Sequence, residues 1–284
     1  MPSFNIADSG AVRDGKTDKA AAIQRIIDEC HASGGGRVIV PAGGVFVTGP
    51  FKLKSCVELN IEASATLRAS LDESLYTETP FNNWSEGWMW ISAKGAHHIA
   101  IMGTGTVDGR GTEFMDSEEP THYKFVNGID RRPHLLTLIG CNNVTICEVT
   151  FANAAYWCVH PAGCQDVLIQ GVRILPSLKV RNCDGIDIDH CRNVRISNCY
   201  IESADDCICI KNRRDSTRFV SMDTGYSRAP KVAMQGFIRN MDSWSAMKAS
   251  TQGANSSATP MKIPGSSSAG ARPTGDRSTG LLRR

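Results

Sequence analysis

The chain has 284 residues, of which 41% are hydrophobic and 21% charged, so it can bury a sizeable core in one or two domains. No apolar run approaches the roughly 18 residues that span a bilayer, which excludes a membrane-spanning protein and predicts no membrane partner. Met1–Asn5 carries neither the basic nor the apolar part of an export signal. The chain as written is therefore expected in the cytoplasm, and outside the cell if a leader has been removed.

One helix is predicted near the start of the chain. Apolar residues at helical spacing predict it from about Lys19 to His31, with Thr17 or Asp18 as its N-cap. The tryptophan-containing segment from Tyr76 to Ser92 is expected to be irregular. Elsewhere, short apolar runs bounded by Gly, Asn and Asp predict strands, among them Phe4–Ile6, Arg37–Pro41, Val45–Thr48, Val57–Ile61, Ile99–Met102, Leu135–Ile139 and Val144–Ile146.

An internal repeat organises the middle of the chain. The segments Cys141–Phe151, Cys164–Ile174 and Cys191–Ile201 align with one another at offsets of 23 and 27 residues. A period of this length with alternating apolar positions is typical of a solenoid. Because the repeats contain strands and no helix, we expect an all-β fold, a parallel β-helix, with the N-terminal helix covering its first coil.

The eleven cysteines are expected to be small buried thiols. All lie at or before Cys209, and no Cys-x-x-Cys pair or His-x-x-x-His partner accompanies them, so no metal site is predicted. The three that open the repeats, Cys141, Cys164 and Cys191, are expected to stack as a ladder on neighbouring coils. Left-handed backbone is expected at three turn positions of the repeats, Asn142, Asp166 and Asn193.

A dense group of carboxylates follows the repeats. The segments Asn182–Asp189 and Ala204–Lys211 alternate apolar residues with aspartates, which predicts strands that bury one face and present acids on the other. Asp184 and Asp205 are 21 residues apart, about one coil. The aspartates concerned are Asp184, Asp187, Asp189, Asp205 and Asp206.

Several motifs stand in a fixed order ahead of and within these acidic segments. They are Gly34-Gly35-Gly36, Gly103-x-Gly105-x-Val107-Asp108-Gly109, Arg132-Pro133 and Asn153-x-x-Tyr156-Trp157-x-Val159-His160-Pro161. With these motifs the chain resembles glycoside hydrolase family 28, the polygalacturonases and their pectin-degrading relatives, from about Phe4 to Lys211. The resemblance implies a right-handed parallel β-helix that hydrolyses glycosidic bonds in a uronate-containing, pectin-like polysaccharide. It implies neither a metal nor an organic cofactor, and no nucleic-acid partner.

The resemblance also assigns roles to the acids. Inverting hydrolysis needs a protonated carboxyl at the leaving oxygen and a carboxylate that activates water, about 6.5–9.5 Å apart. By resemblance, Asp205 is the general acid, and Asp184 and Asp206 hold and activate the water. Asn182 and His160 are the implied substrate-binding residues, although a structural role is equally open for His160. Asp187 and Asp189, which match no assigned role, are expected in turns or along the cleft.

Two alternatives to this hydrolase remain. The family pattern continues with Gly-His-Gly and Arg-x-Lys, and neither follows the paired acids in this chain. An inactive or truncated β-helix that only binds carbohydrate is therefore the first alternative. The second is a calcium-dependent pectate lyase of the same fold, in which the acids would hold the ion.

A second segment is expected from residue 213 onward. Residues 1–212 would form the β-helix, incomplete at its C-terminal end, whereas residues 213–284 contain twelve Lys and Arg against four Asp and no Cys. Such composition predicts a basic segment of low order, which could bind nucleic acid or an acidic surface. We favour a different hypothesis, in which residues 213–284 are translated out of frame. A shifted reading of the codons for residues 237–248 can spell a sequence that resembles the missing Gly-His-Gly element.

Overall fold

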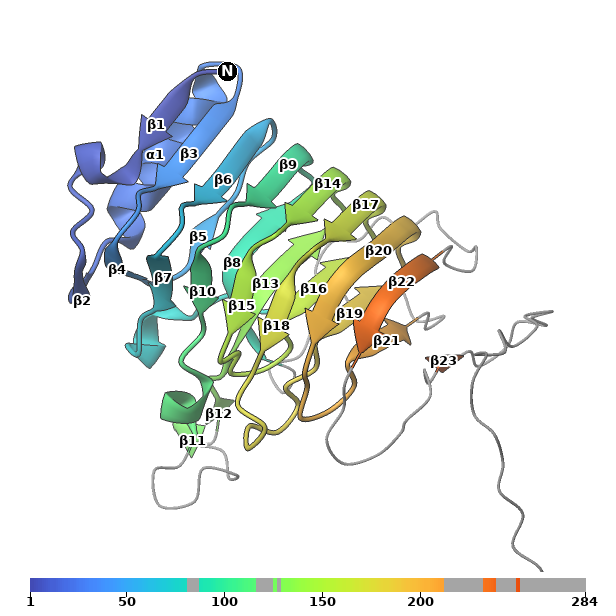
Figure 1. Cartoon of the computed structure of the whole chain (residues 1–284). Helices are drawn as coiled ribbons and strands as arrows, with labels where there is room; N and C mark the ends of the chain where they lie inside the picture. Colours follow the sequence, from blue (N-terminus) through green and yellow to red (C-terminus); the bar gives the residue numbers. More distant parts are fainter. Residues whose placement is uncertain (81–86, 116–124, 127–128, 212–231, 239–248, 251–284) are drawn as a thin grey trace, which may run out of the picture. The chain divides into compact units, whose positions relative to one another are not determined.

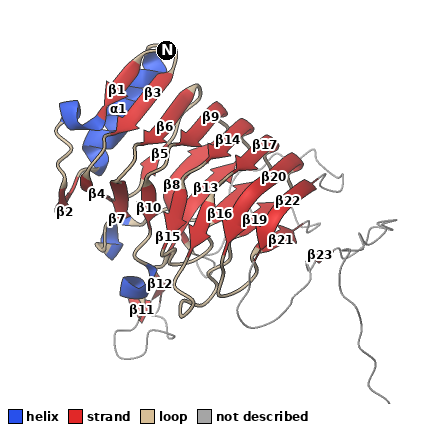
Figure 2. Ribbon diagram, in the orientation of Figure 1, coloured by secondary structure: helices blue, strands red, loops and turns tan. Residues whose placement is uncertain are grey.

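The computed structural model of the protein describes residues 1–80, 87–115, 125–126, 129–211, 232–238 and 249–250. Parallel strands dominate it, stacked coil upon coil in three sheets (Figures 1 and 2). The predicted parallel β-helix is therefore confirmed. Among the described residues, none of the helices has the length and apolar composition needed to cross a membrane.

The strands fall into three parallel sheets and one small hairpin. The first sheet contains β1 (Ser3–Asn5), β3 (Gly36–Val40), β6 (Val57–Ile61), β9 (His97–Met102), β14 (Asn142–Cys147) and β17 (Gln165–Gln170). The second contains β2 (Asp14–Asp18), β4 (Gly44–Thr48), β7 (Ala65–Ala69), β10 (Thr106–Asp108), β15 (Thr150–Ala152) and β18 (Arg173–Leu175). The long strand β20 (Arg192–Ile201) pairs with both of these sheets and so joins them into one continuous 14-stranded sheet. The third contains β5 (Phe51–Lys52), β8 (Trp88–Lys94), β13 (Pro133–Ile139), β16 (Val159–Ala162), β19 (Ile186–Asp189) and β21 (Ile208–Lys211). The antiparallel hairpin is β11 (Phe125–Val126) with β12 (Ile129–Asp130).

The predicted repeats form successive coils in register. Val144 pairs with Val167, which in turn pairs with Val194, and all three are buried. Side chains alternate along each strand, so apolar columns fill the interior while the other positions face outward. In the third sheet, Ile186 and Ile188 belong to the main core, which leaves the intervening Asp187 on the outer face.

The cysteine ladder forms as predicted. Cys141, Cys164 and Cys191 are each about 1% exposed, and the Cys164 backbone N–H donates to Cys191 Sγ at 3.4 Å. All eleven cysteines are free thiols. Burial raises the pKa of the Cys158 and Cys164 thiols, which keeps these side chains in their unreactive protonated form.

The expected left-handed turn positions are right at two of three sites. Asp166 and Asn193 have φ of 55° and 60°, but the matching residue of the first repeat is Asn143, at 54°, and not Asn142. Asn142 instead pairs in register with Gln165. The expectation was wrong by one residue, since the repeat alignment itself places Asn143, and not Asn142, opposite Asp166 and Asn193.

Helix α1 (Ala20–Ala32) covers the first coil. Ile23, Ile26, Ile27 and Cys30 are its buried residues, at the spacing that predicted the helix. The N-cap position is Lys19, one residue after the predicted Asp18, and the Asp18 carboxylate accepts the backbone N–H of Ala20 at 2.8 Å. Short 3-10 turns occupy Ile6–Ser9 (η1), Glu73–Leu75 (η2) and Gly111–Phe114 (η3).

Two described strands lie beyond residue 212. Strand β22 (Val232–Ile238) pairs in parallel with β20, and β23 (Ala249–Ser250) pairs with β21. Strand pairing therefore continues into the segment that was expected to lack it. The rest of residues 213–284 lies outside the described residues, and the out-of-frame hypothesis for this segment stays a prediction.

Candidate active site

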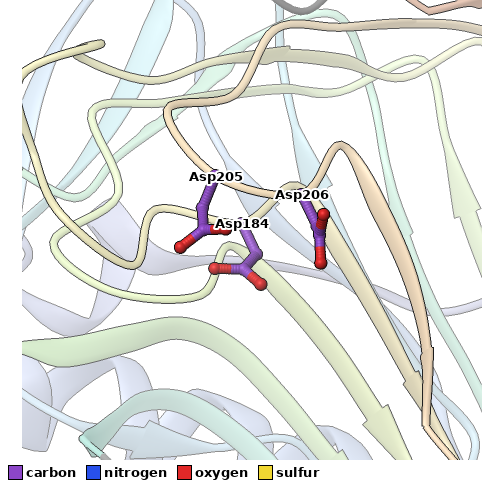
Figure 3. A group of neighbouring side chains, drawn as sticks. All are labelled: Asp184, Asp205 and Asp206. Atoms are coloured by element: carbon purple, nitrogen blue, oxygen red, sulfur yellow. The ribbon is translucent and has the colours of Figure 1, made fainter. Parts of the chain in front are cut away.

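Three aspartates meet on the outer face of the third sheet, where two neighbouring coils enter it. Asp184 precedes β19, and Asp205 and Asp206 precede β21 on the next coil. One carboxylate oxygen from each residue lies within 4.8 Å of one from both others. Figure 3 shows the three side chains gathered together. The aspartates that the sequence assigned to catalysis are therefore gathered at one place.

Gly185 lets these two coils approach. A Cβ atom at this position would lie 2.4 Å from the carbonyl oxygen of Cys207 and 2.7 Å from Ile201 Cγ2. The Gly185 N–H donates to the carbonyl of Asp206 at 2.9 Å, which fixes the acids of one coil against those of the other. Ser203 Oγ strengthens the junction by donating to the carbonyl of Cys183 at 2.6 Å.

Replacing Gly185 with alanine is expected to separate the two coils. Backbone of the next coil, and not a flexible side-chain end, lies where the methyl group would go, so the strands must shift at the site of the acids. We expect a loss of unfolding free energy of about 1–3 kcal/mol, as for other overpacked sites, together with loss of activity. Urea unfolding measures the first effect. The same change at Gly43, where a Cβ would meet no atom within 4 Å and only the left-handed φ of 73° opposes the substitution, is the steric control.

The three carboxylates differ in their surroundings. Asp184 is 6% exposed, and its Oδ1 is buried without a hydrogen-bond partner in the described part of the chain, whereas Asp205 is exposed. Burial raises the pKa of Asp184 well above its usual range, and the neighbouring charge of Asp187 adds to the rise. The trio thus combines a carboxyl that readily holds a proton with one that reaches solvent.

Lys211 supplies a positive charge beside the acids. Its Nζ donates to Asp187 Oδ1 and lies 3.1 Å from the centroid of the Trp157 ring. Asp187 is fully buried and the Lys211 side chain is 14% exposed, so protein encloses most of this ion pair. Asp187 lies within β19, which corrects the expectation that it would occupy a turn or line the cleft.

Asp189 is likewise buried in β19 instead of lining a cleft. His190 Nδ1 lies 2.6 Å from Asp189 Oδ1, and His160 Nε2 lies 3.8 Å from Asp189 Oδ2. Burial alone would raise the pKa of Asp189, but the hydrogen bond with His190 and the nearby His160 ring outweigh it and lower this pKa to about 2. His190 has a left-handed φ of 51°, and Gly163 has a similar φ of 61° in the turn of the preceding coil. This backbone conformation is uncommon for a residue other than glycine, and it accompanies the contact of His190 with Asp189.

The two residues assigned to substrate binding lie in different settings. His160 has no exposed surface, and its ring lies 4.9 Å from that of Trp157, edge to face. This burial favours the structural role that the sequence left open for His160. Asn182 is half-buried beside the acids, and its Oδ1 accepts a hydrogen bond from Arg132 Nη2 at 3.3 Å.

Arg132 joins three successive coils beneath the site. Its guanidinium pairs with Asp130, with Nη2 2.9 Å from Oδ2, and Nη1 donates to the carbonyls of Ala155 at 3.1 Å and Arg181 at 2.6 Å. Only 1% of Arg132 is exposed. The sequence marked Arg132 as part of a motif without revealing this function, because its partners are up to 50 residues away.

The arrangement allows two kinds of chemistry. Carboxyls of unequal pKa on one face can share acid and base roles in hydrolysis. The same oxygens, Asp184, Asp205 and Asp206, are also the only group in the described ranges whose spacing could hold a metal ion. Oxygen donors of this type suit Ca²⁺ or Mg²⁺.

Comparison with known proteins shows the family. The model of glycosyl hydrolases family 28 matches residues 30–226, more than half of the chain. The chain belongs to glycosyl hydrolases family 28. A family 28 relative from Vitis vinifera, named "Probable polygalacturonase", is 33% identical over 228 residues, covering 75% of this chain and 45% of its own length.

Solved structures agree with this membership. An exopolygalacturonase from Thermotoga maritima is 28% identical with a TM-score of 0.65, covering 76% of this chain and 56% of its own. The family 28 exopolygalacturonase of Yersinia enterocolitica is 27% identical with a TM-score of 0.62, covering 73% and 44%. The chain spans about half the length of the curated relatives it matches. The family 28 match continues to residue 226, past the boundary expected at 212.

The Asp189 interaction predicts an acid-dependent stability. A carboxyl whose pKa falls from about 3.9 when unfolded to about 2 when folded stabilises the fold above pH 4, and this contribution disappears as the pH falls toward 2. We expect Asp189→Asn to lower the unfolding free energy by about 2–3 kcal/mol at pH 7, and by much less at pH 2.5. Urea unfolding at both pH values measures this, with exposed Asp8→Asn as the control. Equal losses at both pH values would contradict the assignment.

Proposed function

We propose that this chain hydrolyses glycosidic bonds in a uronate-containing, pectin-like polysaccharide. The observation that carries the proposal is the meeting of Asp184, Asp205 and Asp206 on adjacent coils in a member of family 28. The named relatives are polygalacturonases and exopolygalacturonases, which supports a galacturonate-containing substrate.

Within this proposal the exposed Asp205 donates the proton to the leaving oxygen. It is the trio's exposed member, and the stacked pair Asp184 and Asp206 would hold the attacking water between two coils. Burial raises the pKa of Asp184. Asp184 can therefore accept a proton from water only when contacts with substrate or water stabilise its charged form. In the reverse assignment Asp184 is the acid, and the pH dependence of the activity distinguishes the two.

Inversion of configuration is proposed from the family. The 4.8 Å limit between nearest carboxylate oxygens is shorter than the separation of about 6.5–9.5 Å typical of inverting enzymes. The stereochemical proposal therefore does not rest on this distance. NMR of the first product formed reads the anomer directly.

Release of reducing ends from polygalacturonate tests the function. A hydrolase yields new reducing ends that depend on Asp205, without a metal requirement and without products that absorb in the ultraviolet. Unsaturated, ultraviolet-absorbing products that require Ca²⁺ would identify the lyase alternative instead. Binding of polygalacturonate without any release would identify the carbohydrate-binding alternative.

A further inference from the structure

A pocket of about 280 Å³ lies at the N-terminal end of the third sheet, where helix α1 meets strands β5 and β8. Its apolar lining includes Met89 and Leu75. Its polar lining comprises Asp18, Gln24, Lys52, Thr77, Glu78 and Ser92. The pocket shares no residue with the aspartate trio.

The walls of the pocket are held in place by hydrogen bonds. Gln24 of the helix is joined to Lys52 of β5 in both directions, with Lys52 N donating to Gln24 Oε1 at 2.7 Å and Gln24 Nε2 donating to the Lys52 carbonyl at 3.2 Å. Asp18 Oδ1 accepts the backbone N–H groups of Ala20 at 2.8 Å and Gly49 at 2.9 Å. These contacts fix the wall before any ligand arrives, which lowers the entropy cost of binding.

The pocket offers hydroxyl groups and a small negative charge. Thr77 and Ser92 line it and form no side-chain hydrogen bond with the described residues, so both can bond to a ligand. Lys52 is paired with Glu78, and both side chains are about half exposed at the rim. With Asp18, the lining carries two carboxylates against one ammonium. A ligand rich in hydroxyls suits this lining, whereas an added carboxylate would face like charges.

The floor of the pocket belongs to the same outer face as the acids. Ser92 pairs in register with Thr137, and Thr137 pairs with His160 on the next coil. Asp187 follows one coil further, since Val159 pairs with Ile186. Strand β8 is thus three coils from β19, about 14 Å at a strand spacing of about 4.8 Å. Thr137, His160 and Asp187 are themselves buried, so a chain molecule that reached both places would lie on the residues that cover them.

We propose that this pocket is a second carbohydrate-binding site, which takes a hydroxylated sugar unit without a free carboxylate. In a galacturonate-containing chain, such a unit is a methyl-esterified or neutral sugar. This inference rests on the proposed function in one respect, namely that a polysaccharide runs along the third sheet. The pocket selects the uncharged unit because Glu78 and Asp18 oppose a second carboxylate while Lys52 is already paired.

Calorimetric titration of the full chain with short oligogalacturonides, methyl-esterified or unesterified, tests the proposal. The Asp205→Asn background prevents cleavage during the titration. Thr77→Trp, at an exposed rim position, is expected to weaken binding of the esterified ligand about tenfold by filling the pocket. Val12→Trp, another exposed residue outside the pocket, is the matched control and should leave binding unchanged. Glu78→Gln should narrow the preference for the esterified ligand several-fold.

The outcomes separate this site from the proposed activity. A selective loss with Thr77→Trp, together with the changed preference of Glu78→Gln, supports the pocket whether or not the parent chain releases reducing ends. Identical binding by the Thr77→Trp and Val12→Trp variants overturns it, even if the chain proves to be a hydrolase. A parent chain that prefers unesterified ligand, with no response to Glu78→Gln, overturns the selectivity.

Discussion

Replacing Asp205 with asparagine is expected to lower kcat on polygalacturonate by about 10²–10⁴-fold. This is the range typical of removing a positioned general acid. The fold should survive, because Asp205 is exposed and its backbone N–H, which bonds to Ser203 Oγ at 3.2 Å, is retained in the variant. Reducing-end release, with the unfolding midpoint measured in parallel, distinguishes lost chemistry from lost structure.

The pH profile makes this result specific. The alkaline limb of kcat/KM reports deprotonation of the acid, and the acidic limb reports protonation of the base. If Asp205 is the donor, the residual activity of Asp205→Asn loses its alkaline limb, and Asp184→Asn loses the acidic one. The exchange of these two outcomes would assign the acid to Asp184, in line with its raised pKa. Exposed Asp8→Asn should leave both limbs in place.

The repeat carried most of the information about the fold. A parallel coil stacks each residue on its counterpart, so the alignment of Val144, Val167 and Val194 in sequence is also their alignment in space. The same periodicity located the cysteine ladder and the aspartates of adjacent coils. It failed between repeats, where the segment expected to be irregular contains β8, with Trp88 and Trp90 in a strand. Apolar residues on both sides of that strand hide the alternation that normally reveals one.

The sequence predicted which aspartates meet at the site, but not how deeply each one is buried or which charges lie beside it. Spacing indicated that Asp184 and Asp205 would lie on neighbouring coils, yet it could not show which acids are buried. Asp187 and Asp189 are enclosed because Lys211 and two histidines compensate them, and these pairings depend on register between strands. Charge partners across coils are set by tertiary packing, which no local pattern encodes.

Arg132→Met is expected to destabilise the protein more than any other change proposed outside the acids. The substitution leaves Asp130 buried without its cation, and it removes donors from the carbonyls of Ala155 and Arg181. Loss of one partner of a buried ion pair typically costs about 3–5 kcal/mol. Urea unfolding measures the loss. Arg25→Met is the control. Arg25 lies 3.9 Å from Glu29 and its side chain is 59% exposed, so this substitution should change stability little.

A double variant tests whether the charge, and not the volume of the side chain, explains the effect. Replacing both partners of a buried pair with apolar residues is often close to neutral, so Asp130→Leu combined with Arg132→Met should recover much of the stability. Additive losses would contradict this account. Because Arg132 also bonds to Asn182 Oδ1 at 3.3 Å, the stable double variant still lacks one support of the segment that carries Asp184. It should therefore hydrolyse polygalacturonate more slowly than the parent, with stability restored and the aspartate trio chemically intact.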